Sequence, residues 1–218
     1  MSPKLTLYSH KVGPNGWKVA QVLSELGLEY ETIFKEFGDG ENGMKTPEFE
    51  KINPNGRIPA LVDHSNNDLI IWESGAIILY LVKKYDTEHL LYPASIEEQA
   101  IVDTWFLYQL TGFGPYLGQA VWFKVLTGNT NVEASERYIK ETHRNLKVIN
   151  KQLEKEGSNG WLALGKITIA DISFLQWVRF LYKIEIDIKT EYPAVYDWQE
   201  RLLARPAIKK STEGEVWN

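Results

Sequence analysis

Cysteine is absent from this chain of 218 residues. Its absence excludes disulfide bonds, thiolate metal sites and a cysteine nucleophile. If the chemistry needs a reactive sulfur, that sulfur must therefore come from a ligand. The four histidines are scattered along the chain without metal-ligand spacing, so we expect no metal site; they are His10, His64, His89 and His143.

Long apolar runs and basic clusters are also missing. No stretch approaches the roughly 20 apolar residues of a membrane-spanning helix, so we expect no membrane partner. Lys and Arg form no run longer than two and the net charge is −5, which argues against a nucleic-acid partner. Residues 1–4 lead into a short strand-like run rather than a signal peptide, which favours a cytoplasmic location.

The first third of the chain has the pattern of an α/β domain. Apolar residues in 15–26 recur at helical spacing, and Gly27 is placed to end that helix. Short apolar runs with turn residues between them predict strands. The expected strands are 5–8, 30–34, 58–62 and 69–71, and the expected helices are 15–26, 47–51 and 74–85. This order predicts one mixed sheet with helices on its faces.

The remainder of the chain reads as helical. Residues 87–95 show no periodicity, and Pro93 would block a continuing helix. Helices are expected at 96–126, 132–156, 168–182 and 192–204, with the first bent or split by the Gly-Phe-Gly-Pro sequence at 112–115. We therefore predict an α/β domain at 1–86, a linker at 87–95 and an all-helical domain at 96–218.

A Glu-Ser pair stands where the strand near residue 70 runs into the next helix. The N-terminus of a helix favours anions, so the hydroxyl and N–H of Ser74 can take a carboxylate. The carboxylate of Glu73 can pair with an ammonium group. The pair therefore suits the amino-acid end of a peptide, although a helix cap ahead of a core helix would need the same residue types.

Three motifs resemble those of the glutathione transferase superfamily. The sequence RIPAL (57–61) resembles its proline-before-strand element, ESGAI (73–77) its γ-glutamyl motif, and LGKITIAD (164–171) its helical-domain signature. The resemblance implies an N-terminal thioredoxin-like domain with a mixed four-stranded sheet, followed by a C-terminal helical domain. Within the family, the PNGWKV and IWESGAI segments most resemble the fungal group typified by the yeast nitrogen-regulation prion protein, and the related nu class.

This resemblance implies a transferase that uses glutathione as co-substrate. Its activated thiolate would attack a small electrophile, or a disulfide in a reductase reaction, and the family implies a homodimer. The alternative is a catalytically quiet glutathione-binding regulatory protein.

By the same resemblance, Asn15 is the residue nearest the glutathione sulfur. A thiolate is stabilised by hydrogen-bond donors and by a helix N-terminus, and Asn15 stands where a helix should begin. Alternatively, Asn15 serves only as an N-cap. A catalytic Ser often stands two residues before Pro14, but Val12 occupies that place here, so we expect weak activity with aryl halides. Tyr8 is expected to pack rather than to act on the sulfur.

The resemblance assigns further contacts to glutathione. Ile58 would offer its backbone groups to the cysteinyl unit, next to a cis bond to Pro59. Arg57 would reach the glycyl carboxylate or simply face solvent. Met44 stands where relatives carry a polar contact, which Lys45 can supply instead.

The helical domain supplies the other expected site residues. Arg137 resembles the arginine by which nu-class relatives reach glutathione, although an exposed helix arginine is the alternative. Aromatic side chains of the broken helix would line the electrophile pocket, although most such stripes are core; the candidates are Trp105, Tyr108 and Trp122.

Thr168 and Asp171 have the spacing of a capping box ahead of an apolar helix, so we assign them to folding. Loss of that cap would cost about 1 kcal/mol or more.

Overall fold

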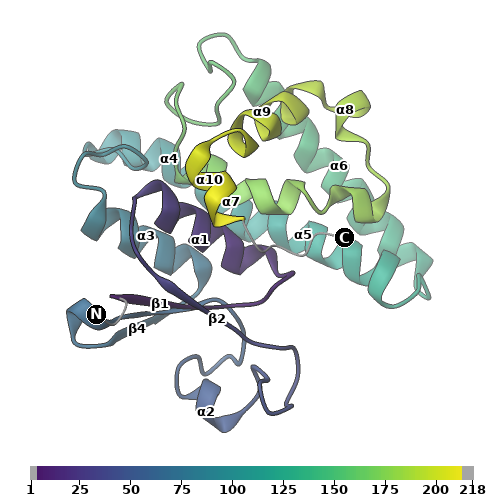
Figure 1. Ribbon diagram of the computed structural model, residues 1–218. Coiled ribbons are helices and arrows are strands. Elements are labelled where there is room, and N and C mark those ends of the chain that lie inside the picture. The colour runs from purple at the N-terminus through teal and green to yellow at the C-terminus, as the bar shows by residue number, and fades with distance from the viewer. Residues whose placement is uncertain (1–3, 213–218) are drawn as a thin grey trace. The chain divides into compact units, whose positions relative to one another are not determined.

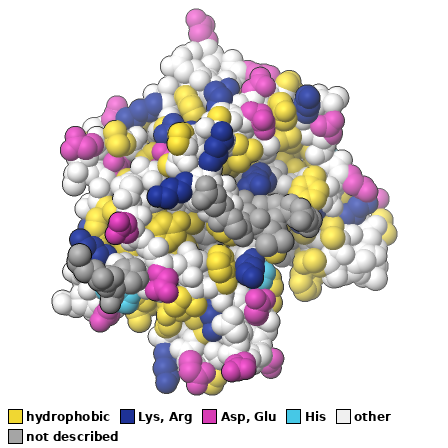
Figure 2. Space-filling view, viewed as in Figure 1, with side chains coloured by type: hydrophobic (Ala, Val, Ile, Leu, Met, Phe, Trp, Pro, Cys, Tyr) yellow, Lys and Arg dark blue, Asp and Glu magenta, His cyan; other side chains and the backbone are white. Residues whose placement is uncertain are grey.

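The computed structural model describes residues 4–212, which divide into two compact units (Figure 1). The first unit comprises residues 4–88 and 205–212, and the second comprises residues 89–204. Within residues 4–212, no helix is long and apolar enough to cross a membrane. On the face drawn in Figure 2, acidic and basic side chains are interspersed.

The first unit is built on a mixed four-stranded sheet with the strand order β2-β1-β3-β4. The sheet comprises β1 (Leu5–Ser9), β2 (Glu31–Phe34), β3 (Ala60–Asp63) and β4 (Leu69–Trp72). β1 pairs parallel with β2 and antiparallel with β3, and β4 pairs antiparallel with β3. The predicted mixed sheet is therefore confirmed.

Two helices cover one face of this sheet, and a short one lies on the other (Figure 1). The first two are α1 (Pro14–Glu25) and α3 (Ser74–Tyr85), and the short one is α2 (Pro47–Glu50). Fully buried apolar side chains of the two long helices and of the sheet form the core, including Leu7, Val19, Leu23, Leu61, Ile77 and Leu81. α1 ends before Gly27, which has φ +66°, as the sequence predicted.

The C-terminal helix belongs with the first unit, whereas we expected residues up to 218 to form part of the helical domain. This helix, α10 (Pro206–Ser211), packs against α1. Ile208 is fully buried, and the Arg205 guanidinium donates two hydrogen bonds of 2.7 Å to the Glu25 carboxylate. Such forked pairing and a buried apolar contact are long-range interactions that local sequence patterns do not reveal.

The second unit is helical throughout. Its helices are α4 (Ile96–Tyr108), α5 (Gly114–Val121), α6 (Val132–Glu154), α7 (Ile169–Val178), α8 (Ile188–Glu191) and α9 (Pro193–Leu203). The long helix expected at 96–126 is neither split nor broken by its Gly-Pro sequence. It passes instead through two π-helical stretches, Gln109–Phe113 and Trp122–Leu126. A π-turn inserts an extra residue while keeping the backbone hydrogen-bonded, which explains why the helix continues.

The predicted capping box is present at the start of α7. The buried carboxylate of Asp171 accepts hydrogen bonds from the N–H and the hydroxyl of Thr168, at 2.9 and 3.0 Å. It also accepts from the Leu162 N–H and from Nε1 of Trp198, both at 3.0 Å. Burial raises the pKa of Asp171 to about 6, although these four hydrogen bonds favour the charged form. Asp171 thus connects the helix cap to a preceding loop and to α9.

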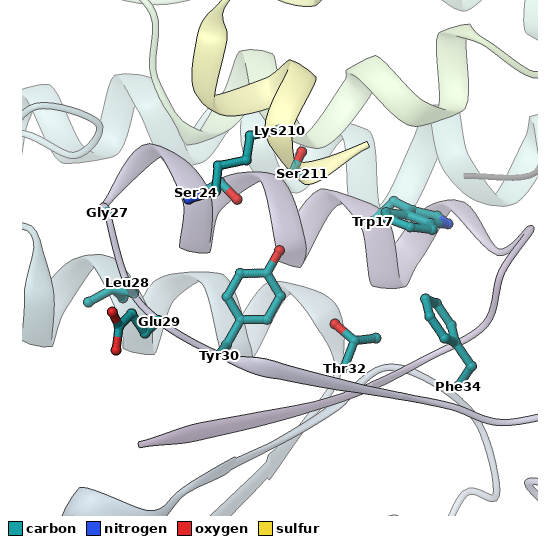
Figure 3. Close-up of a pocket in the computed structure, with 10 residues that line it drawn as sticks. All are labelled: Trp17, Ser24, Gly27, Leu28, Glu29, Tyr30, Thr32, Phe34, Lys210 and Ser211. Carbon is teal, nitrogen blue, oxygen red and sulfur yellow. The ribbon is translucent and has the colours of Figure 1, made fainter. Parts of the chain in front are cut away.

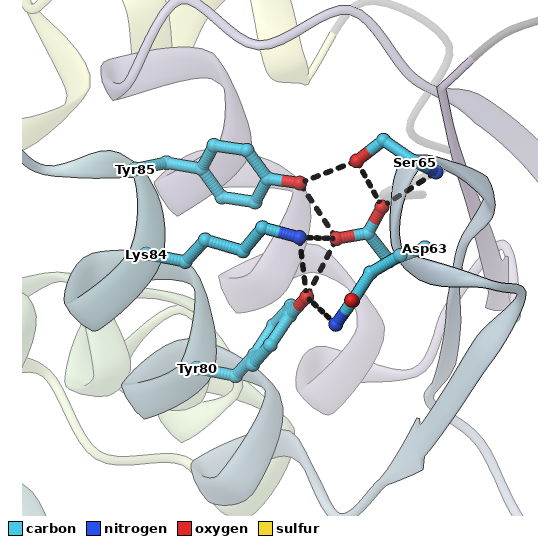
Figure 4. Close-up of polar contacts among 6 residues, drawn as sticks. Asp63, Ser65, Tyr80, Lys84 and Tyr85 are labelled. Atoms are coloured by element: carbon cyan, nitrogen blue, oxygen red, sulfur yellow. Dashed lines mark hydrogen bonds and ion pairs between the residues drawn. The ribbon is translucent and has the colours of Figure 1, made fainter.

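A second buried carboxylate, Asp63, ties the end of β3 to α3 (Figure 4). It accepts hydrogen bonds from Tyr80, Tyr85 and Lys84 at 2.6, 2.6 and 2.8 Å. It also accepts from the backbone N–H and the hydroxyl of Ser65 at 2.9 and 2.6 Å. Burial alone would raise the pKa of Asp63, but these donors outweigh it and hold that pKa well below its usual range.

Candidate functional site

The start of α1 is held close to the end of β1. Pro14 is the first residue of the helix and Gly13 is its N-cap, without a side-chain hydrogen bond. Asn15 therefore lies inside the first turn, and the alternative that it is the N-cap is wrong. A Cβ at Gly16 would overlap the hydroxyl of Ser9, so glycine permits this close approach. The first-turn N–H groups have no partner within the helix, and the helix dipole favours an anion at this end.

The residue before Pro59 lies beside this helix start. The peptide bond between Ile58 and Pro59 is cis, as the resemblance implied. A Cβ at Gly13 would lie 3.2 Å from Cδ1 of Ile58, so the N-cap of α1 and Ile58 are in contact. Ile58 is half-buried and packs on a small core cluster. The structure thus brings the neighbourhood of Asn15 and Ile58 together.

The loop before Ile58 is fixed by a residue that we did not single out. Asn53 is buried, its amide donates to the Arg57 carbonyl at 2.5 Å, and its side-chain oxygen accepts the Asn55 N–H at 3.0 Å. Nζ of Lys45 donates to the Asn55 carbonyl at 3.1 Å. The side chains of Lys45 and Arg57 are exposed. Two of the three cations predicted to contact glutathione therefore meet at one loop, because Arg57 belongs to it and Lys45 is hydrogen-bonded to it.

The backbone at Glu73 is strained. Glu73 has φ +70° and ψ 117°, a region that non-glycine residues rarely occupy, and its exposed side chain makes no capping hydrogen bond. Ser74 is buried and is the first residue of α3. Strain of this kind costs about 1–3 kcal/mol and is found mainly at functional sites. Glu73 occupies the N-cap position of α3, but the helix-cap alternative does not explain its carboxylate, which makes no capping hydrogen bond.

A buried lysine of α1 lies within electrostatic range of this strained residue. Lys18 lies one turn after Asn15 and is only 1% exposed. Burial lowers the pKa of Lys18 to about 7, and the negative charge of Glu73 opposes that shift. The two charges are therefore close enough to interact. Lys18 was missed because its neighbours Val19 and Val22 give the helix an ordinary apolar pattern.

Two residues near the predicted site belong to the core. Met44 is buried in a cluster with Phe49 and Ala60. The ring of Tyr8 packs on this cluster, with its centroid 5.6 Å from that of Phe49. The expectation that Tyr8 packs is confirmed. The side chain of Met44 offers no polar group to a ligand here, whereas its neighbour Lys45 is exposed.

The other predicted site residues lie in the second unit. Trp105 and Tyr108 meet edge to face, with centroids 5.9 Å apart. Both line a cavity of about 440 Å³ on α4, together with Leu107 and three other residues. Trp122 does not line that cavity; it is exposed in the second π-helical stretch. Arg137 is exposed on α6.

A further cavity, of about 570 Å³, lies between α1 and the segment that leads into β2 (Figure 3). The rings of Trp17 and Phe34 stand at one end of it, and the Tyr30 hydroxyl donates to the Ala20 carbonyl of α1 at 3.4 Å. None of the residues predicted to bind glutathione lines this cavity.

Two family models match the chain. Residues 3–83 match the glutathione S-transferase N-terminal domain, and residues 111–206 match the glutathione S-transferase C-terminal domain. The first match covers the four-stranded sheet, which with its helices forms a thioredoxin-like domain.

Individual relatives agree with these matches. The transcriptional regulator URE2 of Saccharomyces cerevisiae is 39% identical over 242 residues, which cover 96% of this chain and 68% of the relative. A structure of Ure2p in complex with glutathione is 41% identical, with a TM-score of 0.91 over 97% of this chain and 94% of the other. The glutathione transferase URE2P6 from Phanerochaete chrysosporium, in complex with oxidized glutathione, is 46% identical, with a TM-score of 0.91 over 99% of this chain and 97% of that chain. The chain belongs to the glutathione S-transferase superfamily and, within it, to the Ure2-like fungal group.

Proposed function

We propose that this protein is a glutathione-dependent enzyme that binds glutathione in its first unit and activates the thiol at the start of α1. The observation that carries the proposal is the strained conformation of Glu73 at the start of α3, next to the buried Ser74. The charge of Glu73 interacts with that of Lys18, which lies one turn from Asn15. Structures of two relatives, one in complex with glutathione and one with oxidized glutathione, support the choice of ligand.

The two ends of glutathione would meet different groups. Glu73 would pair with the ammonium of the γ-glutamyl end, and Ser74 with its carboxylate. The backbone of Ile58 would pair with the cysteinyl unit in the manner of an added strand. Arg57, exposed on the adjoining loop, and Lys45, an exposed residue that donates to the Asn55 carbonyl of that loop, would attract the glycyl carboxylate.

The cysteinyl sulfur would then lie near Asn15. The amide of Asn15 and the first-turn N–H groups of α1 donate to a sulfur anion and favour the thiolate, which is the nucleophile. In conjugation, the thiolate forms a carbon–sulfur bond and the leaving group departs with its electron pair. In disulfide reduction, the thiolate attacks one sulfur and the other leaves as a thiolate. A second glutathione thiolate then resolves the mixed disulfide, releasing the second substrate thiol and glutathione disulfide.

In the second unit, Trp105 and Tyr108 are the candidates for contact with the apolar part of the electrophile, and Arg137 for a contact with glutathione. Trp122 remains a candidate from the resemblance alone. The cytoplasm, where glutathione keeps thiols reduced, would supply the co-substrate.

A second candidate function is a regulatory protein that binds glutathione without turnover. The 39% identity to a transcriptional regulator favours keeping this alternative. Turnover separates the two: tight glutathione binding without reaction on any electrophile or disulfide would favour the regulatory protein.

Replacement of Asn15 by Ala tests the proposed role of the amide. We expect kcat/KM for conjugation and for disulfide reduction to fall about 10- to 100-fold, because a donor to the sulfur anion is lost. Glutathione affinity should change less, because the contacts to the peptide skeleton remain. Steady-state kinetics and calorimetric titration of glutathione would measure both effects.

Asn150→Ala is the matched control, because Asn150 lies on α6 and donates to Glu154 at 2.8 Å. Its kinetics should equal those of the wild type. Unchanged rates of both reactions in Asn15→Ala would contradict the role assigned to Asn15.

We also propose that the protein forms a homodimer. The edge strand β4 exposes three large apolar side chains, namely Leu69, Ile70 and Trp72, with exposed fractions of 39–43%. An apolar edge strand is the kind of surface that a second copy covers. Sedimentation should give twice the chain mass of 25.1 kDa. A single-chain mass at micromolar concentration would contradict the dimer.

A further inference from the structure

His10 stands at the point where β1 gives way to the loop before α1. It is 8% exposed, and its Nδ1 accepts the backbone N–H of Val12 at 3.0 Å. An N–H can be accepted only by an unprotonated ring nitrogen, so the ring is neutral and carries its proton on Nε2. The contact from residue i to the N–H of residue i+2 is the one that Asn and Asp make in turns.

Groups from neighbouring segments enclose the imidazole. Nε2 lies 3.8 Å from Oε2 of Glu36, the charged side chain that faces the ring from the segment after β2. The ring of Phe37 lies over it, with centroids 4.1 Å apart, and Phe37 is itself 67% exposed. The uncharged Gly13 lies against the His10 Cβ on the loop side.

The loop that His10 holds leads directly into the proposed catalytic turn. Residues 10–13 precede Pro14 and Asn15, and side-chain hydrogen bonds hold this loop. One runs from the Val12 N–H to His10, one from Nε1 of Trp17 to the Lys11 carbonyl at 2.9 Å, and a longer one from the Ser9 hydroxyl to the His10 carbonyl at 3.5 Å. Of these hydrogen bonds, only the first depends on a titratable group.

We propose that His10 is a positioning residue of the glutathione site, whose neutral imidazole holds the 10–13 loop in the turn that aims Asn15 at the sulfur and whose protonation releases that turn. This inference rests on the proposed function for its effect on catalysis. The turn itself can be observed without any activity.

The direction of the pH effect follows from the surroundings of the ring. Burial lowers the pKa of His10, and the nearby carboxylate of Glu36 opposes the shift. A lowered pKa means that the folded protein keeps the neutral ring below the ordinary range of histidine. The contribution of the turn is therefore complete above that range and is lost as the pH falls through the folded-state pKa.

Two variants of His10 and one control distinguish the pH effect of His10 from other effects of pH and of histidine replacement. His10→Asn keeps an acceptor for the Val12 N–H, since the side chain of Asn53 accepts the N–H of Asn55 in the same way in this chain. The Asn side chain does not titrate. His10→Ala removes the acceptor at every pH. His89→Asn is the control: His89 lies outside the proposed site and has φ +53°, which Asn tolerates.

Profiles of kcat/KM against pH would be measured for all four proteins. At pH 8 we expect His10→Asn to retain the wild-type value within about threefold and His10→Ala to lose about 10-fold, since a displaced catalytic group costs rate rather than stability. As the pH falls through the folded-state pKa of His10, the ratio of wild type to His10→Asn should fall about 10-fold, to the level expected for His10→Ala. Loss of the glutathione thiolate at low pH affects every protein alike and cancels in this ratio.

Nitrogen NMR of the His10 ring and of the Val12 amide gives a readout independent of activity. The inference predicts a proton on Nε2 at pH 8 and a shift of the Val12 amide that follows the His10 titration. A proton on Nδ1 at pH 8, or a Val12 amide that ignores the titration, would overturn the positioning role even in an active enzyme. A flat ratio of the two pH profiles would do the same. Absence of all turnover with the predicted NMR result would instead overturn the proposed function alone.

Discussion

Replacing Asp171 by Asn is expected to lower the free energy of unfolding by about 3 kcal/mol, and replacing it by Ala by somewhat more. The buried carboxylate accepts four hydrogen bonds, from Thr168, Leu162 and Trp198. The Asn side chain has an NH2 group in place of one carboxylate oxygen, so the two donors that bond to that oxygen lose their acceptor. Because the donors come from a loop and two helices, the loss exceeds that of an ordinary cap. Urea unfolding followed by circular dichroism would measure it.

The pH dependence of this effect has a definite sign. Burial raises the pKa of Asp171 to about 6, so the folded protein gains a proton there while the unfolded chain is still ionised. The contribution of Asp171 to stability therefore grows as the pH falls from about 7 to about 5. The difference between the wild type and the Asn variant, which does not titrate, should widen over that range.

Asp187→Asn is the matched control for this substitution. Asp187 is an exposed N-cap that accepts the Lys189 N–H at 3.1 Å and the Thr190 hydroxyl at 2.7 Å. Asn caps helices as well as Asp does, so little change is expected. Equal stabilities of the wild type and Asp171→Asn would contradict the account of the buried carboxylate.

Replacing Glu73 by Gly is expected to weaken glutathione binding about 10- to 100-fold, the worth of a hydrogen bond to a charged group. Folding should suffer only through the lost interaction with the charge of Lys18. Glu73 makes no capping hydrogen bond, and its φ of +70° is natural only for glycine. Relief of about 1 kcal/mol of strain offsets the extra freedom that glycine gives the unfolded chain. Calorimetric titration of glutathione and thermal unfolding of the same samples would measure both quantities.

The control is Glu185→Gly. Glu185 has φ +63° in the second unit and forms an exposed ion pair with Lys124 at 3.3 Å. Its replacement also removes a side chain at a positive φ, here in the left-handed region, and should leave glutathione affinity unchanged. If Glu73→Gly bound glutathione as tightly as the wild type, the Glu73 carboxylate would have no part in glutathione binding. The backbone strain at Glu73 would then have no functional explanation.

The order of strands and helices could be read from the sequence because each element carries its own periodicity. Val19 and Leu23 mark the buried face of α1, and Gly27 marks its end. The capping box of Thr168 and Asp171 was likewise local, and the structure contains it. What the spacing could not show is that Asp171 also binds the Trp198 indole, 27 residues away.

The arrangement of residues around the candidate site was harder to predict from the sequence. The motif identified Glu73 and Ser74, but the positive φ of Glu73 depends on how β4 turns into α3. Lys18 and Asn53 are polar residues whose burial follows from tertiary packing. The first π-helical stretch escaped prediction because Gly112 and Pro115 ordinarily interrupt a helix, whereas here a wider turn absorbs them.

The central claim is that this protein binds glutathione and stabilises its thiolate at the start of α1. A spectrophotometric pH titration of the thiolate absorbance, with glutathione bound to the wild type and to Asn15→Ala, tests it most directly. The account predicts a thiol pKa lower in the wild-type complex than in free glutathione, with much of that shift lost in the variant. A bound thiol that titrates as it does in solution, or glutathione that does not bind, would contradict it.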